Sequence, residues 1–265
     1  NLMLELQNIS YGVEQDGDSK NILRDISLTI DERFVAITGP NGGGKSTLAK
    51  VIAGILTPTQ GRILLDGEDI TYLPEHKRAK RIARIFQDPM RGTAPDLTLE
   101  ENVALAYARA GGHLFAPALP RKKRAFFREQ LARLDMGLED RMKTRIGLLS
   151  GGQRQAVTLL MATINTPRVL LLDEHTAALD PGTAEKVLAL TQSIVAEHHI
   201  TCLMVTHNMT QALSLGNRTL MMADGGIVLD VAGAERAGMT VEDLVERFRA
   251  GTGRTLDNDR MLLSE

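Results

Sequence analysis

Residues 34–52 read FVAITGPNGGGKSTLAKVI, and this stretch decides the fold class. Its first four residues form a nearly continuous apolar run with β-branched members, which is typical of a short buried strand. The glycine-rich segment 39–44 follows, and apolar residues then recur at helical spacing from Leu48 to Ile55. The stretch therefore predicts a strand, a glycine loop and a helix in direct succession.

The loop satisfies the pattern G-x-x-x-x-G-K-[ST], with Gly39, Pro40, Asn41, Gly42, Gly43, Gly44, Lys45 and Ser46, and Thr47 follows it. Backbone N–H groups of such a loop converge on phosphates, and the dipole of the following helix adds a favourable potential. We expect Lys45 to reach the β- and γ-phosphates of a nucleotide and Ser46 to ligate Mg²⁺. The alternative is a glycine turn that only caps a helix, but the flanking strand and helix disfavour it.

Composition narrows the function classes. The chain has 265 residues, 43% of them hydrophobic, with a formal charge of -2, which predicts one sizeable core with at most an attached lobe. The near-neutral charge and the 3% of aromatic residues argue against a nucleic-acid-binding surface. The single cysteine, Cys202, excludes an intramolecular disulfide framework and fits a reducing compartment. No apolar run reaches the ~18 to 20 residues that cross a bilayer, and Asn1 to Ser10 lack signal-peptide features, so we expect a soluble cytoplasmic protein.

Further apolar runs predict a layered α/β domain. Residues 169–172 and 201–205 are two more candidates for buried strands, with a helical pattern at 183–197 between them. Continuous apolar strands separated by helices imply a parallel sheet that is covered on both faces. Alternating patterns at 4–9 and 22–30 predict an antiparallel pair at an edge.

The domain boundaries follow from where the strands stop. Successive helical patterns without a strand between them indicate a mainly helical insert at 88–164. We therefore predict an α/β P-loop NTPase core with a parallel sheet and an antiparallel β edge subdomain, built from residues 1–87 and 165–230. Residues 231–265 are expected to form about one short C-terminal helix and a polar tail.

Two carboxylates end the apolar run at 169–172, namely Asp173 and Glu174. Parallel α/β sheets place their ligands at the carboxyl ends of strands. Beside a phosphate loop, Asp173 is expected to hold Mg²⁺ and Glu174 to polarise a water for in-line attack on the γ-phosphate. The alternative, an acid pair at a helix N-cap, would be favoured only without the phosphate loop.

A third element identifies the family. Leu149-Ser150-Gly151-Gly152-Gln153 opens a helix with a serine and two glycines, an arrangement that presents N–H groups to an anion. With this LSGGQ pentapeptide the chain resembles the ATP-binding cassette (ABC) ATPases over about residues 2–226. The other matching motifs are Gln87 after the strand expected at 82–86, the D-loop Ala178-Leu179-Asp180, and Thr206-His207 after the last core strand.

The resemblance implies that one nucleotide lies between the phosphate loop of one subunit and the signature of another, so dimerisation is part of the active site. It implies that Ser150 and Gly152 complete the γ-phosphate cradle in trans. Gly151, Gln153 and Asp180 are expected among the nucleotide-binding residues. It also implies that Gln87 senses Mg²⁺ and the attacking water and that His207 contacts the γ-phosphate. His76 and His198-His199 match none of these motifs and are expected at the surface or at helix ends.

Three positions depart from the family pattern. The aromatic residue that stacks on adenine would fall on Val13, with Tyr11 two residues earlier, so Tyr11, Val13 or neither contacts adenine. Gly43 stands where serine is frequent, which is a mild change because the backbone makes most contacts there. His175 follows Glu174 where proline is usual.

The family resemblance also implies partners. A lone cassette subunit of this size usually pairs with integral membrane permease subunits and, for import, with an extracytoplasmic substrate-binding protein, at the cytoplasmic face of the membrane. Residues 92–95, 99–102 and 173–181 resemble ATPases of bacterial uptake systems of the tryptophan and aromatic-compound type. The basic runs 76–84 and 121–124 are expected to be solvated helix faces, with lipid head groups as the alternative. The rival function is a soluble non-transport ABC ATPase, such as a cluster-assembly ATPase.

Overall fold

The computed structural model describes residues 3–86, 92–111 and 121–252. The chain divides into two compact units. Unit 1 comprises Asn1–Ile82, Leu171–Glu174 and Thr201–Glu265, and unit 2 comprises Ala83–Leu170 and His175–Ile200. Each unit is described by itself below. The predicted division into a core at 1–87 and 165–230 and an insert at 88–164 stays a prediction.

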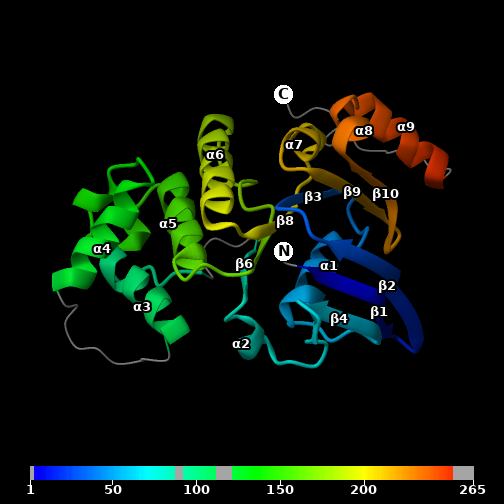
Figure 1. Cartoon of the computed structure of the whole chain (residues 1–265), viewed down its shortest axis with the longest axis horizontal. Helices are drawn as coiled ribbons and strands as arrows, with labels where there is room; N and C mark the ends of the chain where they lie inside the picture. The colour runs from blue at the N-terminus through cyan, green and yellow to red at the C-terminus, as the bar shows by residue number, and fades with distance from the viewer. Residues whose placement is uncertain (1–2, 87–91, 112–120, 253–265) are drawn as a thin grey trace. The chain divides into compact units, whose positions relative to one another are not determined.

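An antiparallel sheet forms one layer of unit 1 (Figure 1). Its strands are β1 (Leu4–Gln15), β2 (Asp18–Ile30), β4 (Gln60–Leu65) and β5 (Glu68–Asp69), in the order β2-β1-β4-β5. The expected edge pair is confirmed, with Leu4 opposite Ile30 and Leu6 opposite Leu28. The strands are longer than the alternating patterns predicted, and the turn between them contains only Asp16 and Gly17.

The second sheet has six strands in the order β10-β9-β3-β8-β7-β6. They are β3 (Phe34–Thr38), β6 (Ile82–Ile85), β7 (Val169–Asp173), β8 (Thr201–Val205), β9 (Arg218–Ala223) and β10 (Gly226–Ala232). Strand β3 pairs in parallel with β8, as the continuous apolar runs predicted. It also pairs in parallel with β9, which was not predicted. Every residue of β3, β7 and β8 is buried, which is typical of central strands with both faces covered. Strand β10 forms one edge of this sheet and pairs antiparallel with β9. The sequence did not predict this β9–β10 hairpin.

Helix α1 (Lys45–Ala53) begins directly after the glycine loop, as predicted. Its apolar residues Leu48, Val51 and Ile52 are fully buried. The helix ends two residues earlier than the pattern suggested because Gly54 takes a left-handed conformation at its C-cap, and Ile55 is 36% exposed.

The sequence predicted a solvated face for the whole basic run at 76–84, and one of its residues, Arg78, departs from this. Arg78 ends the short helix α2 (Glu75–Arg78) and is only 2% exposed. Its guanidinium donates to the carbonyl oxygens of Val51 and Ile52 at the end of α1, at 2.9 and 3.0 Å. The Val51 oxygen also accepts a hydrogen bond from the Gly54 backbone N–H, at 3.2 Å. Arg78 therefore adds side-chain donors to the C-terminal cap of α1.

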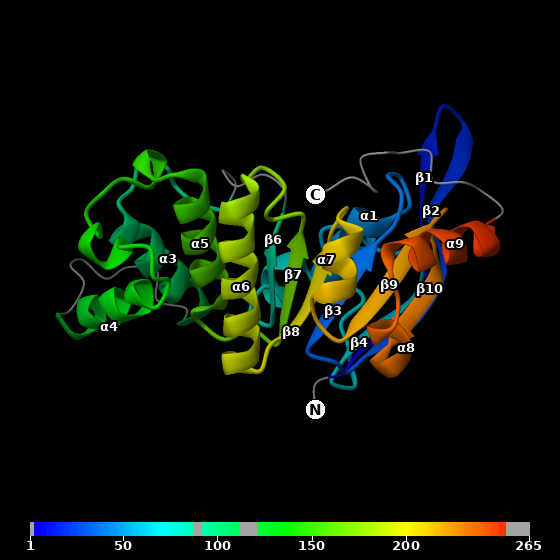
Figure 2. The same ribbon diagram turned by 90° about the horizontal axis from the view of Figure 1, so that it is seen from above.

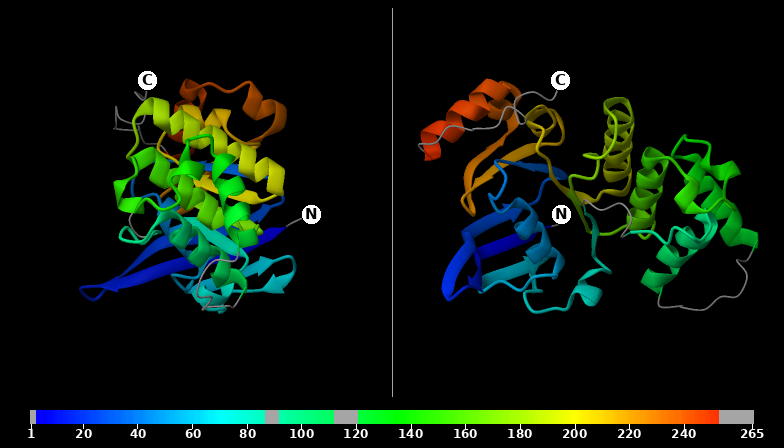
Figure 3. Two further views of the ribbon diagram at one scale, coloured as in Figure 1. Left: turned by 90° about the vertical axis from the view of Figure 1, so that its left-hand side faces the viewer. Right: turned by 180° about the vertical axis from the view of Figure 1, so that it is seen from behind.

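The C-terminal part of unit 1 contains more structure than predicted. The expectation of about one helix beyond Asp230 is wrong, because β10 continues to Ala232 and two helices follow, α8 (Gly233–Ala237) and α9 (Val241–Thr252). Figure 3 shows both beside the β9–β10 hairpin. Leu244 and Phe248 of α9 pack against Met209, Met221, Leu229 and Val231.

Unit 2 is mainly helical. Its helices are α3 (Leu99–Gly111), α4 (Arg121–Ala132), α5 (Gly151–Thr163) and α6 (Pro181–His198), with short 3₁₀ turns at Leu138–Asp140 and Ile146–Leu148. The core is built from leucine and valine around three neighbouring rings, Tyr107, Phe126 and Phe127, whose centroids lie 5.7 to 5.9 Å apart. Helices α5 and α6 run side by side (Figure 2). None of the helices in the described ranges combines the length and apolar character that a bilayer crossing requires.

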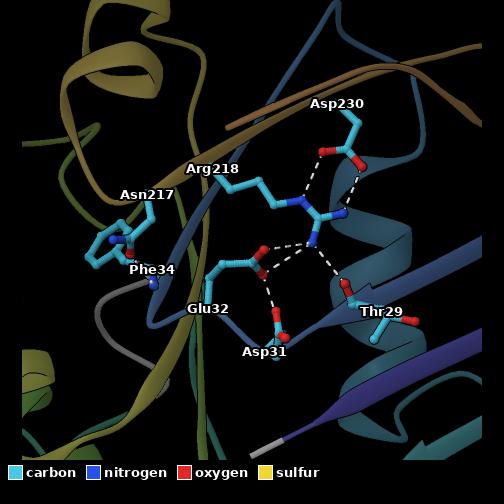
Figure 4. Close-up of polar contacts among 7 residues, drawn as sticks. All are labelled: Thr29, Asp31, Glu32, Phe34, Asn217, Arg218 and Asp230. Atoms are coloured by element: carbon cyan, nitrogen blue, oxygen red, sulfur yellow. Dashed lines mark hydrogen bonds and ion pairs between the residues drawn. The ribbon is translucent and has the colours of Figure 1, made fainter. Parts of the chain in front are cut away.

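One arginine ties the two sheets of unit 1 together (Figure 4). Arg218 of β9 makes two hydrogen bonds to Asp230 of β10, at 2.8 and 2.6 Å. The same guanidinium donates to the Thr29 carbonyl oxygen at the end of β2 and pairs with Glu32 at 3.1 Å. The Arg218 side chain is only 12% exposed, whereas Glu32 and Asp230 are 28% and 43% exposed. The hydrogen bonds to Asp230 are the first cause of a raised Arg218 pKa.

We predict that Arg218→Met lowers the free energy of unfolding by about 1–3 kcal/mol, because it leaves partly buried carboxylates and a carbonyl without their donor. The matched control is Arg62→Met, whose pair with Asp69 is 60% and 40% exposed. Hydrogen bonds from Thr71, rather than Arg62, are the main cause of the lowered Asp69 pKa of about 2. The control should cost less than about 1 kcal/mol in urea denaturation. Equal losses would contradict the role assigned to Arg218.

Candidate active site

The phosphate loop between β3 and α1 has a backbone that only glycine adopts readily. Gly39 and Gly44 have φ values of +137° and +97°, which side chains rarely tolerate. A Cβ on Gly39 would lie 2.0 Å from the carbonyl oxygen of Met222, and one on Gly44 would lie 2.9 Å from Leu23. The glycines that the motif singled out are thus required by close packing against β9 and β2, in addition to any phosphate contact.

Lys45 lies over this loop. Its ammonium donates to the carbonyl oxygens of Gly39 at 2.7 Å and Pro40 at 2.9 Å, and the residue is 5% exposed. Burial lowers the Lys45 pKa, whereas the nearby carboxylates Glu174 and Asp173 raise it. A cation held inside the glycine loop is placed where the motif predicts phosphate binding.

Asp173 and Ser46 meet at the same edge. The Ser46 hydroxyl hydrogen-bonds to Asp173, the last residue of β7, whose pKa is raised, mainly by burial. The second oxygen, Asp173 Oδ1, is buried and has no hydrogen-bond partner among the described residues. An orphaned carboxylate oxygen beside a hydroxyl fits the hard oxygen ligands that Mg²⁺ prefers. No group of three or more His, Cys, Asp and Glu residues gathers in the described ranges.

Glu174 and His207 face one another. His207 Nε2 contacts Glu174 Oε1, with the glutamate side chain 7% and the histidine side chain 41% exposed. The backbone N–H of Glu174 donates to the Val205 carbonyl oxygen at the end of β8, at 3.0 Å, and that of Thr206 donates to the Ile37 carbonyl oxygen in β3, also at 3.0 Å. The ends of β3, β7 and β8 therefore bring the two residues together.

The alternative reading of Asp173 and Glu174 as a helix N-cap is wrong. Helix α6 begins at Pro181, and its N-cap is Asp180, whose side chain accepts a hydrogen bond from the Thr183 backbone. The Asp180 pKa is lowered, chiefly by the Thr183 side chain. The predicted D-loop aspartate is thus a helix cap in this chain.

His175 occupies a buried place that suits a neutral ring. Thr191 donates its hydroxyl hydrogen to the Val187 carbonyl oxygen at 2.7 Å, so His175 Nε2, at 3.1 Å, must donate to the Thr191 oxygen. Burial lowers the His175 pKa to about 4. Glu174 before it has φ of +51°, and a proline at 175 would push Glu174 toward extended backbone. Histidine is therefore compatible with the backbone observed at Glu174.

The signature segment opens α5 as predicted. Ser150 is the N-cap, and its hydroxyl accepts from the Gln153 backbone while the Gln153 side chain accepts from the Ser150 backbone N–H. A Cβ on Gly152 would lie 2.1 Å from Thr183 Cγ2, whereas one on Gly151 would meet only Leu179 at 3.4 Å. Gly152 is thus needed for the close approach of α5 and α6.

The predicted site residues fall into two groups. Residues 39–47, Asp173, Glu174 and His207 lie in unit 1, and residues 150–153 and Asp180 lie in unit 2. Gln87 lies outside the described residues. Tyr11 and Val13 are both half-buried on β1, so the adenine contact stays open. His76 is exposed and His198-His199 end α6, as expected.

The sequence reasoning used Thr206 only as part of a motif and missed its contacts. Its hydroxyl donates to Gln211 Oε1 at 3.1 Å and accepts from the Asn208 backbone N–H at 3.0 Å. Asn208 is the N-cap of helix α7 (Met209–Ser214) and accepts from the Gln211 backbone. The signal was present in the sequence, because asparagine is a preferred N-cap residue.

A parallel sheet, a glycine loop opening a helix and two carboxylates at the end of β7 define a P-loop nucleoside triphosphatase. The family model for ABC transporters matches residues 23–177. The chain is 42% identical to a tyrosine transport ATP-binding protein of Clostridioides difficile (strain R20291), over 93% of this chain and 98% of that protein. It is 39% identical to a thiamine import ATP-binding protein of Salmonella paratyphi A (strain ATCC 9150 / SARB42), over 73% of this chain and 77% of that protein.

A solved structure supports the same class. A dimeric ATP-binding cassette in a post-hydrolysis state, bound to ADP and inorganic phosphate, matches with a TM-score of 0.71 and 29% identity, over 86% of this chain and 98% of that one. The chain belongs to the ABC transporter family. The predicted fold class and family are confirmed, and so is the predicted function as an ATP-binding and ATP-hydrolysing subunit that energises transport.

We predict that Gly152→Ala destabilises unit 2 by about 1–3 kcal/mol, because the new methyl group overpacks against Thr183. Thr183 has little freedom to move, since its hydroxyl donates to Asp180 at 2.7 Å. Thr183→Ser keeps that hydroxyl and removes the obstructing Cγ2, so the double variant should recover most of the loss in urea denaturation. Gly151→Ala is the matched control and should cost little. A loss that Thr183→Ser leaves unchanged would contradict the packing explanation.

Proposed function

We propose that this chain is the ATPase of an uptake system and that it drives import of an aromatic amino acid through separate membrane permease subunits. The support for import is that the relatives described above are named for tyrosine transport and thiamine import. The substrate class rests on the tyrosine transport relative, which matches nearly the full length of both chains. The protein would then act at the cytoplasmic face of the membrane.

The observation that carries the catalytic proposal is the meeting of Lys45, Asp173, Glu174 and His207 around one sheet edge. Lys45 would bind the β- and γ-phosphates, neutralising charge that develops during phosphoryl transfer. Ser46 and Asp173 would hold Mg²⁺, which when bound neutralises charge on the phosphates.

Glu174 is the general base in this proposal. It accepts a proton from a water whose oxygen attacks the γ-phosphorus, while the bond from that phosphorus to the ADP oxygen breaks, giving ADP and inorganic phosphate. His207 contacts the Glu174 carboxylate and so orients it, and in this proposal its ring would also contact the γ-phosphate. The low exposure of Glu174 limits access of other waters.

The remaining predicted residues act in the dimer. Ser150, Gly151, Gly152, Gln153 and Asp180 would complete the site of a second copy, and Gln87 would report on Mg²⁺ and the attacking water. The support is twofold: α5 starts with N–H groups at a capped N-terminus, and the related cassette bound to ADP and phosphate is dimeric. An extracytoplasmic substrate-binding protein would deliver the solute to the permease.

Lys45→Ala should abolish tight ATP binding, because the phosphates lose the only side-chain cation that donates within the loop among the described residues. Isothermal titration calorimetry measures the change. Lys50→Ala is the matched control, since Lys50 lies exposed on the same helix. Unchanged affinity in Lys45→Ala would remove the loop as the nucleotide site.

Glu174→Gln should retain ATP binding and lose turnover by about 10³-fold or more, because the amide has no basic oxygen to accept the proton. The variant should also accumulate as an ATP-dependent dimer in size-exclusion chromatography. Glu185→Gln on α6 is the exposed control and should turn over normally. Full activity in Glu174→Gln would exclude this residue as the base.

The transport proposal is tested by expressing the tagged chain with the permease genes that neighbour its own. We expect copurification with an integral membrane chain, faster ATP hydrolysis in the complex, and ATP-dependent uptake of tyrosine rather than thiamine into proteoliposomes. A chain that never joins a membrane partner or gains activity from one would favour the rival, a non-transport ABC ATPase such as a cluster-assembly ATPase.

A further inference from the structure

Arg236 of α8 is a buried cation that the catalytic proposal does not use. The residue is only 9% exposed, and burial lowers its pKa. Among the described residues no carboxylate lies within ion-pair distance of its guanidinium. An arginine buried without an acidic partner is costly unless its N–H groups are satisfied by other acceptors.

The acceptors are gathered at the C-terminal end of α7. The guanidinium donates to the carbonyl oxygens of Ala212 at 3.2 Å and Gly216 at 2.6 Å, and also to that of Leu215. Its Nε donates to the Thr219 hydroxyl at 2.8 Å, and that hydroxyl in turn donates to the Ala212 oxygen. The last carbonyls of a helix have no partner within it and carry partial negative charge, so Arg236 caps α7 both by hydrogen bonds and by charge.

The other end of α7 carries the loop with His207. Asn208 caps the helix, and Thr206 is bound to Gln211 in its first turn. Both neighbours of His207 are thus fixed to α7. The helix has only six residues, and it packs on β3, β9 and α9. So short a helix is poorly stable by itself, and its placement must come from contacts at its ends and sides.

We propose that Arg236 is a positioning residue for His207: by holding the C-terminal end of α7, it sets where the N-terminal end places the histidine against Glu174. The segment beyond β9 then influences catalysis through the contacts of Arg236 with α7, without touching the nucleotide itself. This inference rests on the role proposed above for His207, and the experiment separates the failure of one from the failure of the other.

The experiment is a double-mutant cycle on ATP hydrolysis by the full chain. His207→Ala should lower kcat strongly, and Arg236→Met should lower kcat by about tenfold with the KM for ATP changed less than about threefold. If Arg236 acts through His207, the double variant should match His207→Ala within about twofold. Independent effects that multiply would overturn the proposal, as would an unchanged kcat in Arg236→Met. An unchanged kcat in His207→Ala would instead refute the catalytic role of that histidine.

Arg218→Met is the matched control, because Arg218 precedes Thr219 on the same strand but bonds to Asp230, Glu32 and Thr29 rather than to α7. Its effect on kcat should be the same factor with and without His207. If Arg236→Met fails to fold, Arg236→Lys, which keeps the charge and fewer donors, replaces it in the same cycle.

Nuclear magnetic resonance gives a second readout that does not depend on turnover. The chain has six histidines, and the ring signal of His207 is assigned by its loss in His207→Ala. Arg236→Met should shift this signal and leave that of the distant His76 in place. A His207 signal that stays at its wild-type position would overturn the proposal.

Discussion

The structure depends on the adjacent strands β3, β8 and β7, whose ends meet at one edge of the sheet. Two backbone hydrogen bonds fix this edge, from Glu174 to the Val205 oxygen and from Thr206 to the Ile37 oxygen. Each is worth only about 1 kcal/mol net, but the strands they join are wholly buried, so water cannot compete for these bonds. The glycine loop, the paired carboxylates and the histidine therefore lie at the same edge of the sheet, although they are far apart in the sequence.

Two short helices lead away from this edge, and a buried arginine ends each of them. Arg78 takes the carbonyls at the end of α1, and Arg236 takes those at the end of α7. Neither is held mainly by a carboxylate, and desolvation is the largest influence on the pKa of both. In both helices the cap at the far end fixes the position of the helix without adding charge at its first turn.

The sequence predicted the buried strands, the glycine loop and the opening of α5, because each depends on local pattern: continuous apolar runs, a turn that requires glycine, and a serine at an N-cap. It did not predict the β9–β10 hairpin or α8. Nor did it predict that Arg78 is buried, since a basic run looks the same whether its arginine faces water or caps a neighbouring helix. Gly152 was predicted for phosphate contact, and its packing against Thr183 depends on how α5 and α6 meet, which no local pattern encodes.

The departure at His175 shows how a local rule and a distant contact combine. The left-handed backbone of Glu174 costs about 1–3 kcal/mol unless its surroundings hold it. Here the N–H of Glu174 is bound to β8, and its carboxylate is bound to His207. A proline after it would favour extended backbone, whereas His175 imposes no such restriction. The ring Nε2–H of His175 donates to the Thr191 hydroxyl of α6. With histidine in place of the usual proline, the segment is held by a single buried hydrogen bond from His175 rather than by the rigid ring of a proline. Either protonation state of the ring can donate that bond, and burial favours the neutral imidazole by lowering the His175 pKa.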